Sequence, residues 1–252
     1  MPLVVDAPMS AGFPQIAGHG FQANGIISGV ATAPDGIPGR LEVQGGWMRA
    51  TLDESDEWTA SGLRSECYFA PSSRGEWWYT WEFCVPEGWA VDEHRFIVMQ
   101  IIDSPDPTYL PRHRPFLVYV ERNAGDQLHL VVRVPSAVLP LQDPSGRIVV
   151  ARPLETARVY RMCLHANWQI DNTGFREFFV DDEPLMRHYN TPTTYDDVTG
   201  GYLKLGLYRG STPLNIGRRV AQYRNIKIWS GNDGYQTVMK GAPRPERRLL
   251  VV

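Results

Sequence analysis

Residues 202–209 read Tyr-Leu-Lys-Leu-Gly-Leu-Tyr-Arg, a strict alternation of apolar positions with positions of other kinds. Successive side chains of a β-strand point to opposite faces of the sheet, so the three leucines share one face. The other face carries two phenols, Lys204 and Gly206, a set that suits the floor of a binding groove. The stretch therefore predicts a β-strand that packs on a core with one face and lines a ligand site with the other.

Strand signals continue along most of the chain, and no segment shows a convincing helical period. Clusters of Gly, Pro, Asn and Asp separate candidate strands at 40–50, 62–69, 76–85, 94–102, 115–122, 127–134, 147–151, 157–165, 174–181, 202–209 and 219–229. The spacing is too irregular for a repeat array, and no low-complexity linker divides the chain. We therefore expect an all-β fold, a single-domain jelly-roll β-sandwich of the concanavalin-like type with a concave substrate groove. The domain would span 1–252, with a core at about 40–230 and a C-terminal extension at 231–252.

Composition narrows the possible functions. The chain has 252 residues, of which 43% are hydrophobic, enough to bury a sizeable core. A net charge of −3 gives no basic field for nucleic acid. No apolar run reaches the roughly 20 residues of a membrane span. Lysine is rare, since only Lys204, Lys227 and Lys240 occur among 25 basic residues, which makes Lys204 in a patterned strand more notable.

The three cysteines predict buried free thiols. Cys67, Cys84 and Cys163 are an odd and widely spaced set, without the paired spacing of a zinc site or the density of a disulfide scaffold. Residues 1–12 lack the basic segment and apolar core of a secretory signal, so any export would use a signal not present here or another route.

Two further strands carry polar side chains in alternation. In 62–69, Arg64, Glu66 and Tyr68 share one face, where they would need partners or a ligand if that face is covered. An ordinary Arg–Glu pair on a solvated sheet face explains this strand equally well. In 96–102, Gln100 is the only polar residue, and it is either a hydrogen-bonded core amide or a donor aimed at a ligand.

Weaker signals lie in the C-terminal third. We expect a fourth strand of the same polar set at 219–229, with four residues on one face: Arg219, Tyr223, Asn225 and Lys227. A solvated β-face accounts for most of this pattern. Asn190 stands in a predicted loop before the 202–209 strand, where it either contacts a ligand or makes a turn.

These motifs carry a resemblance. The 202–209 strand resembles the Tyr-Phe-Lys-Ala-Gly-x-Tyr strand of the family-seven alginate lyases and the Tyr-x-Lys-x-Gly-x-Tyr strand of the heparin lyase I and glucuronan lyase group. Arg64-Ser65-Glu66 resembles the Arg-Ser-Glu strand of the alginate lyases, and Met99-Gln100-Ile101 stands where those enzymes have Gln-x-His. Residues 168–190, followed by Gly200 and Gly201, also resemble the heparin-lyase-like pattern. The likeness covers about 40–230.

The resemblance implies a polysaccharide lyase that cleaves a uronic-acid polymer by β-elimination and leaves a 4,5-unsaturated end. Removal of the C5 proton requires that the neighbouring carboxylate be neutralised, and the leaving O4 must gain a proton. By the resemblance, Gln100 and Arg64 neutralise the uronate, Glu66 orients Arg64, Lys204 holds the substrate and Tyr208 donates to O4. Further substrate contacts are expected from Tyr68, Tyr202, Asn190, His113 and His188.

The chain departs from the family pattern at Ile102, where family members commonly have the histidine of the Gln-x-His strand. Tyr208 could serve as both base and acid, with Lys204 or Arg64 as a cationic neighbour, in a syn elimination. An imidazole could instead come from elsewhere in space, with His113 and His188 ranked above His165, although each also reads as a surface or turn histidine. Asp103 is a weaker candidate for the base, because strand alternation directs its side chain to the face opposite that of Gln100.

Two alternatives to the lyase remain open. One is a non-catalytic carbohydrate-binding sandwich related to such lyases. The other is a glycoside hydrolase, which needs carboxylates alternating on one strand as in Glu-x-Asp-x-x-Glu, a motif absent here. We expect no required cofactor, with an assisting divalent cation such as calcium possible. The expected partner is an anionic polysaccharide, with no nucleic acid or membrane, and the chain is expected to act as a monomer in an extracellular or virion-associated setting.

Overall fold

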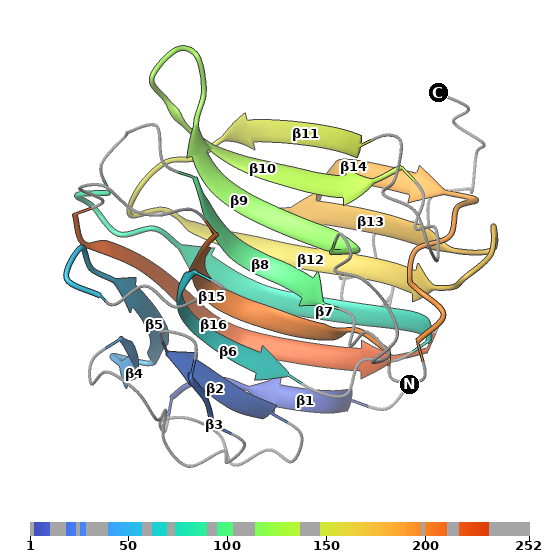
Figure 1. Ribbon diagram of the computed structural model, residues 1–252, viewed down its shortest axis with the longest axis horizontal. Coiled ribbons are helices and arrows are strands. Elements are labelled where there is room, and N and C mark those ends of the chain that lie inside the picture. Colours follow the sequence, from blue (N-terminus) through green and yellow to red (C-terminus); the bar gives the residue numbers. More distant parts are fainter. Residues whose placement is uncertain are drawn as a thin grey trace.

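Sixteen strands in two antiparallel sheets make up the described part of the chain (Figure 1). The computed structural model describes residues 3–10, 19–23, 26–28, 40–56, 62–69, 74–89, 95–102, 114–136, 147–197, 200–210 and 217–231. No helix occurs among these residues, and none of them forms a helix able to span a membrane. The expected all-β sandwich is confirmed.

The first sheet has a linear order of seven strands with one strand added at the side. The order is β14 (Glu183–Tyr189), β13 (Phe175–Val180), β12 (Val159–Trp168), β7 (Gly75–Cys84), β16 (Arg219–Ser230), β5 (Trp47–Leu52) and β4 (Leu41–Gln44), while β1 (Leu3–Ala7) pairs with β16.

The second sheet runs in the order β11 (Arg147–Pro153), β10 (Leu128–Pro135), β9 (Phe116–Arg122), β8 (Phe96–Ile102), β15 (Tyr202–Arg209), β6 (Leu63–Phe69), β2 (His19–Ala23) and β3 (Ile26–Ser28). Its central strands β8, β15 and β6 are far apart in sequence yet hydrogen-bonded neighbours. Polar motifs from three distant segments are thereby brought onto one face.

The core lies between the two sheets, as the alternation of β15 predicts. Leu203, Leu205 and Leu207 are fully buried and belong to the same apolar cluster as Tyr79 and Phe83 of the first sheet. Each fully buried side chain of this kind contributes about 1.5–3 kcal/mol of transfer free energy. The opposite face of the second sheet, called the outer face below, is left for polar side chains.

Several expected strand positions are wrong in detail. Residues 40–50 form a hairpin and not one strand, because Gly45 and Gly46 both have positive φ, 61° and 77°, the conformation of a tight two-residue turn. β14 occupies part of the predicted loop before 202–209. The short strands β1, β2 and β3 were not expected, since three to five residues give little alternation to detect.

The strand at 219–229 is placed in the wrong sheet by the sequence. β16 pairs with β5 and β7 of the first sheet, so Arg219, Asn225 and Lys227 do not share a face with Lys204. Tyr223 instead points through the core, where its buried hydroxyl donates to the carbonyl oxygens of Val98 (2.8 Å) and Gly206 (2.9 Å). It thus satisfies two backbone groups where the pairing of β8 and β15 is irregular.

Gly206 has a different reason to be glycine from the one the sequence suggests. Its φ is 145°, and a Cβ there would lie 2.2 Å from the carbonyl oxygen of Ser65 and 2.6 Å from the Cα of Glu66. The close approach is made by the backbone of β6 and not by a ligand. The three cysteines are free and buried, as expected.

Candidate functional site

Three strands of the second sheet place the predicted site residues in adjacent rows on its outer face. Lys204 of β15 pairs with Tyr68 of β6 on one side and with Gln100 of β8 on the other. Four residues further along β15, Tyr208 pairs with Arg64. Because paired residues of neighbouring strands point the same way, these side chains meet on one surface.

Glu66 contacts both Gln100 and Lys204 in this cluster. It pairs with Gly206, between the row of Lys204 and the row of Tyr208. Its side chain is buried, and its Oε1 accepts a hydrogen bond of 2.5 Å from Nε2 of Gln100. Its Oε2 lies 3.5 Å from Nζ of Lys204. Buried polar groups need such partners, so Gln100 and Lys204 are held in fixed positions by one carboxylate.

Lys204 is only 2% exposed. Burial lowers the pKa of its ammonium, the Glu66 carboxylate acts in the opposite direction, and the charges of Arg64 and Arg114 lower the pKa further. Lys204 therefore gives up its charge at lower pH than a lysine in water.

Two guanidinium groups contact the ring of Tyr208. The Cζ of Arg64 is 4.9 Å from the centre of this ring, and the Cζ of Arg114 is 5.5 Å from it. The tyrosine is 9% exposed, so its ring is mostly shielded from water. The cluster thus combines one phenol with two permanent positive charges.

Arg114 is the site residue that sequence reasoning missed. Its Nε donates a 2.8 Å hydrogen bond to Oε1 of Gln100, which completes a chain from Arg114 through Gln100 to Glu66. It precedes β9, where the segment 112–115 reads Arg-His-Arg-Pro. This basic segment next to a predicted strand is the signal in the sequence that points to Arg114. Of its residues, only His113 is expected from the sequence to contact substrate.

Two tyrosines extend the cluster beyond Lys204. The rings of Tyr68 and Tyr202 meet edge to face with their centres 5.9 Å apart, and the Lys204 ammonium lies 5.8 Å from the centre of the Tyr202 ring. Burial raises the pKa of Tyr202, with the charge of Glu66 adding to the effect. This phenol therefore stays protonated, and with Tyr68 it offers ring edges and faces to a ligand.

Ile102 lies where the parity argument places it, since it pairs with Tyr202 while Gln100 pairs with Lys204. His165 does not replace the missing imidazole. His165 of β12 contacts Glu76 and Glu177 within the first sheet at 2.8 and 2.7 Å. His113 and Asp103 fall outside the described residues.

His188 and Asn190 are not brought into the cluster. His188 belongs to β14 of the first sheet, where its Nδ1 is 3.2 Å from a guanidinium nitrogen of the buried Arg176. Asn190 follows β14 with φ at 55°, the left-handed conformation of a turn residue. The sequence assigns both to a loop before the 202–209 strand, whereas His188 lies in β14. Their contact with substrate stays a prediction.

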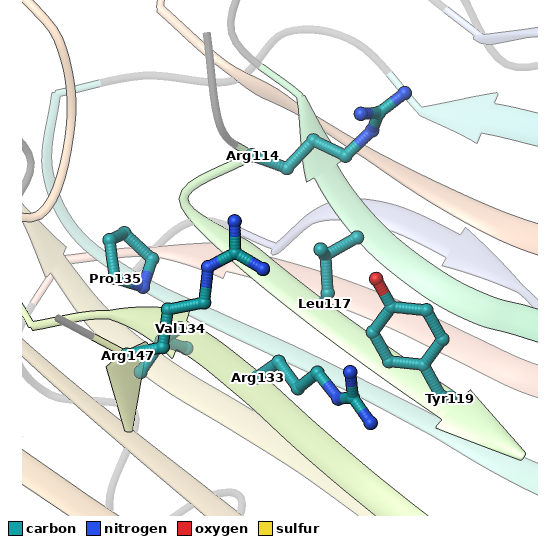
Figure 2. Close-up of a pocket in the computed structure, with 7 residues that line it drawn as sticks. All are labelled: Arg114, Leu117, Tyr119, Arg133, Val134, Pro135 and Arg147. Atoms are coloured by element: carbon teal, nitrogen blue, oxygen red, sulfur yellow. The ribbon is translucent and has the colours of Figure 1, made fainter. Parts of the chain in front are cut away.

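A pocket of about 210 Å³ opens beside the cluster (Figure 2). Its lining comes from the start of β9 to the start of β11 and consists of Arg114, Leu117, Tyr119, Arg133, Val134, Pro135 and Arg147. Arg114 belongs to both places, because its guanidinium also reaches Gln100 and Tyr208. The described residues contain no group of three or more His, Cys, Asp or Glu side chains that could hold a metal ion.

Comparison with known proteins identifies the family of this chain. The polysaccharide lyase family model matches residues 41–232. No curated protein sequence matches significantly.

Solved structures share the fold at low sequence identity. An endo-β-1,4-glucuronan lyase from the fungus Trichoderma reesei is 21% identical, with 73% of this chain and 81% of that chain covered and a TM-score of 0.57. A family 7 alginate lyase in complex with substrate is 13% identical, with 90% and 97% covered and a TM-score of 0.66. An alginate lyase from Pseudomonas aeruginosa is 15% identical, with 86% and 100% covered and a TM-score of 0.62.

Proposed function

Because this chain belongs to the polysaccharide lyase family, we propose that it cleaves a uronic-acid polysaccharide by β-elimination at the cluster around Tyr208. The observation that carries the proposal is the contact of the Tyr208 ring with both Arg64 and Arg114, next to the Gln100–Glu66–Lys204 network. Structural neighbours that are alginate and glucuronan lyases support a uronate substrate.

The chemistry needs three functions at this place. The uronate carboxylate must be neutralised so that the C5 proton becomes acidic enough to remove, a base must take that proton, and O4 must be protonated as its bond to C4 breaks. The electron pair of the C5–H bond forms the C4=C5 double bond, and no water is consumed.

Neutralisation falls to the arginines and to the amide. Gln100 is fixed by Glu66 and Arg114, so its amide is held in one orientation on the outer face. Arg64 and Arg114 bring two cationic forks, the geometry that binds a carboxylate best. The family pattern has a histidine two residues after the glutamine, where this chain has Ile102. In its place, Arg114 supplies a positive charge beside Gln100.

Proton transfer falls to Tyr208. Its phenolate oxygen takes the C5 proton, and the same hydroxyl then gives a proton to O4, which is possible when both lie on the same side of the sugar ring. Lys204 is held by Glu66 and contributes positive charge to the substrate-binding surface. Tyr68 and Tyr202 offer ring faces to the neighbouring sugar.

We further propose that the reaction needs no metal ion, since arginines supply the charge neutralisation, and that one chain forms the whole site. A chelator should then leave the rate unchanged. A polymeric substrate also fits action outside a cell or on a virion.

The test is a panel of alginate, glucuronan, heparin and related polymers incubated with the purified protein. A new ultraviolet absorbance from the unsaturated uronate end is the expected result for at least one of them. Binding to a uronate polymer without any such product would leave the non-catalytic carbohydrate-binding function in its place.

A further inference from the structure

Among the described residues, the pocket beside the catalytic cluster is lined by three arginines and by no carboxylate. Arg114 just before β9, Arg133 of β10 and Arg147 at the start of β11 line this pocket together with Tyr119 of β9 (Figure 2). Such a concentration of forked cations next to a groove recognises planar anions.

Arg133 has one carboxylate partner beside the pocket. One of its terminal guanidinium nitrogens donates to both carboxylate oxygens of Glu121, at 2.7 and 2.8 Å. The Nε of Arg133 is buried, and no described polar atom hydrogen-bonds to it. The charges of Arg133, Arg95, Arg114 and Arg147 all act to lower the pKa of Tyr119, although burial outweighs them and raises it. The four arginine charges therefore all reach this one phenol.

The pocket has a definite position relative to the reaction. Gln100 pairs with Leu117 of β9, and Leu117 pairs with Arg133 of β10, so these three residues lie in one row across the sheet. Two strand spacings amount to roughly 10 Å, farther than one sugar ring reaches from the cluster. A glycan chain that crosses the strands along this row would carry a later sugar over the pocket.

The pocket is also built on a fixed frame. Arg176 of β13 is fully buried and donates hydrogen bonds to the carbonyl oxygens of Pro115 (2.9 Å) and Pro135 (3.0 Å). These bonds tie the start of β9 and the end of β10 to the first sheet, and Pro135 itself lines the pocket. The arginines on either side therefore project from anchored backbone.

We propose that Arg114, Arg133, Arg147 and Tyr119 form a second carboxylate subsite, which binds the uronate group of another sugar of the same polysaccharide chain. The inference rests on the proposed function and adds to it a requirement: the substrate must carry carboxylates on more than the sugar that reacts. Arg114, shared between the two sites, links occupancy of the pocket to the orientation of Gln100.

The test measures binding of saturated oligouronates in a Tyr208→Phe background, in which turnover is removed. The parent is compared with Arg147→Gln, because Arg147 is exposed on the edge strand β11 and its loss should not unfold the protein. Arg122→Gln is the control, since Arg122 is also exposed and lies on β9 of the same sheet but does not line the pocket. Each ligand is titrated by calorimetry as a disaccharide and as a tetrasaccharide.

Arg147→Gln should weaken tetrasaccharide binding on the order of 10-fold, leave disaccharide binding unchanged, and reduce the dependence of affinity on salt. Carboxyl-reduced tetrasaccharide should bind the parent and Arg147→Gln alike. Equal tetrasaccharide affinity in the parent, Arg147→Gln and Arg122→Gln would overturn the subsite while leaving the lyase proposal intact. If Arg147→Gln weakens the binding only of a sulfated glycan that has no uronate, the subsite would also be overturned. If the parent binds no uronate oligomer at all, both proposals fail together.

Discussion

Tyr208 carries the proton transfer in this account, and its hydroxyl is the only part of the side chain that the chemistry uses. Tyr208→Phe should therefore lower kcat by at least the 100-fold typical of losing an acid–base group, while the Kd for a saturated oligouronate stays near the wild-type value. Turnover rates and calorimetric titrations measure the two quantities. Tyr189→Phe, which removes a phenol hydroxyl on the first sheet, is the matched control. Wild-type kcat in Tyr208→Phe would remove Tyr208 from the mechanism.

Replacement of Glu66 tests the electrostatics around Lys204. Burial lowers the pKa of Lys204, and the Glu66 carboxylate is the opposing charge that raises it. Glu66→Gln removes that charge, so the pKa of Lys204 falls further and its ammonium is lost at lower pH. If substrate binding uses this ammonium, the alkaline limb of the pH profile of kcat/KM shifts toward lower pH.

The control for this profile is Glu82→Gln, because Glu82 pairs with Arg224 on the first sheet, away from the cluster. An alkaline limb at the same pH in wild type and Glu66→Gln would mean that the charge of Lys204 does not govern substrate binding.

At the scale of the element, β15 and β6 are held so close that only glycine fits between them. Gly206→Ala places a Cβ 2.2 Å from a backbone oxygen of β6, so the strands must separate. We expect a loss of about 2–5 kcal/mol in the free energy of unfolding, the sum of backbone strain and overpacking. Denaturant titration measures it.

Gly45→Ala provides the comparison, since Gly45 also has positive φ, 61°, but no atom lies within 4 Å of its added Cβ. It should cost only about 1 kcal/mol, the penalty of the left-handed conformation. A Gly206→Ala protein as stable as Gly45→Ala would contradict the close approach of β6.

The elements also show how far the sequence alone reaches. Alternation correctly predicts which face of β15 is apolar, because parity is a local property. The resemblance to the lyases, and not alternation, predicts that Arg64, Glu66 and Gln100 join Lys204. Alternation fails for β16, whose sheet is decided by long-range pairing. Arg114 is missed because its side chain reaches Gln100 from outside the regular strand, where no period exists to read.

At the scale of the whole molecule, Arg176 and His188 link the first sheet to the end of the second where the pocket lies. Burial and the charge of Arg176 lower the pKa of His188 from 6.5 to about 4. The unfolded chain therefore binds this proton more readily than the folded protein. Stability from the neutral imidazole is present above the unfolded pKa and is lost as the pH falls through the folded pKa.

His188→Gln should consequently lose less stability than wild type between about pH 7 and about pH 4, as measured by thermal unfolding at each pH. His129→Gln is the control, because His129 lies half-buried on β10, away from Arg176. Acid sensitivity that is equal in wild type and His188→Gln would show that this histidine does not couple folding to pH.

The central claim is that the chain breaks a glycosidic bond by elimination, without water. It is tested most directly by digesting the best polymer of the panel in water labelled with heavy oxygen and weighing the oligosaccharides by mass spectrometry. Elimination gives products lighter by one water than the hydrolytic fragments, with no heavy oxygen incorporated. Products of hydrolytic mass that carry one heavy oxygen from the solvent would show that the chain is a hydrolase and not a lyase.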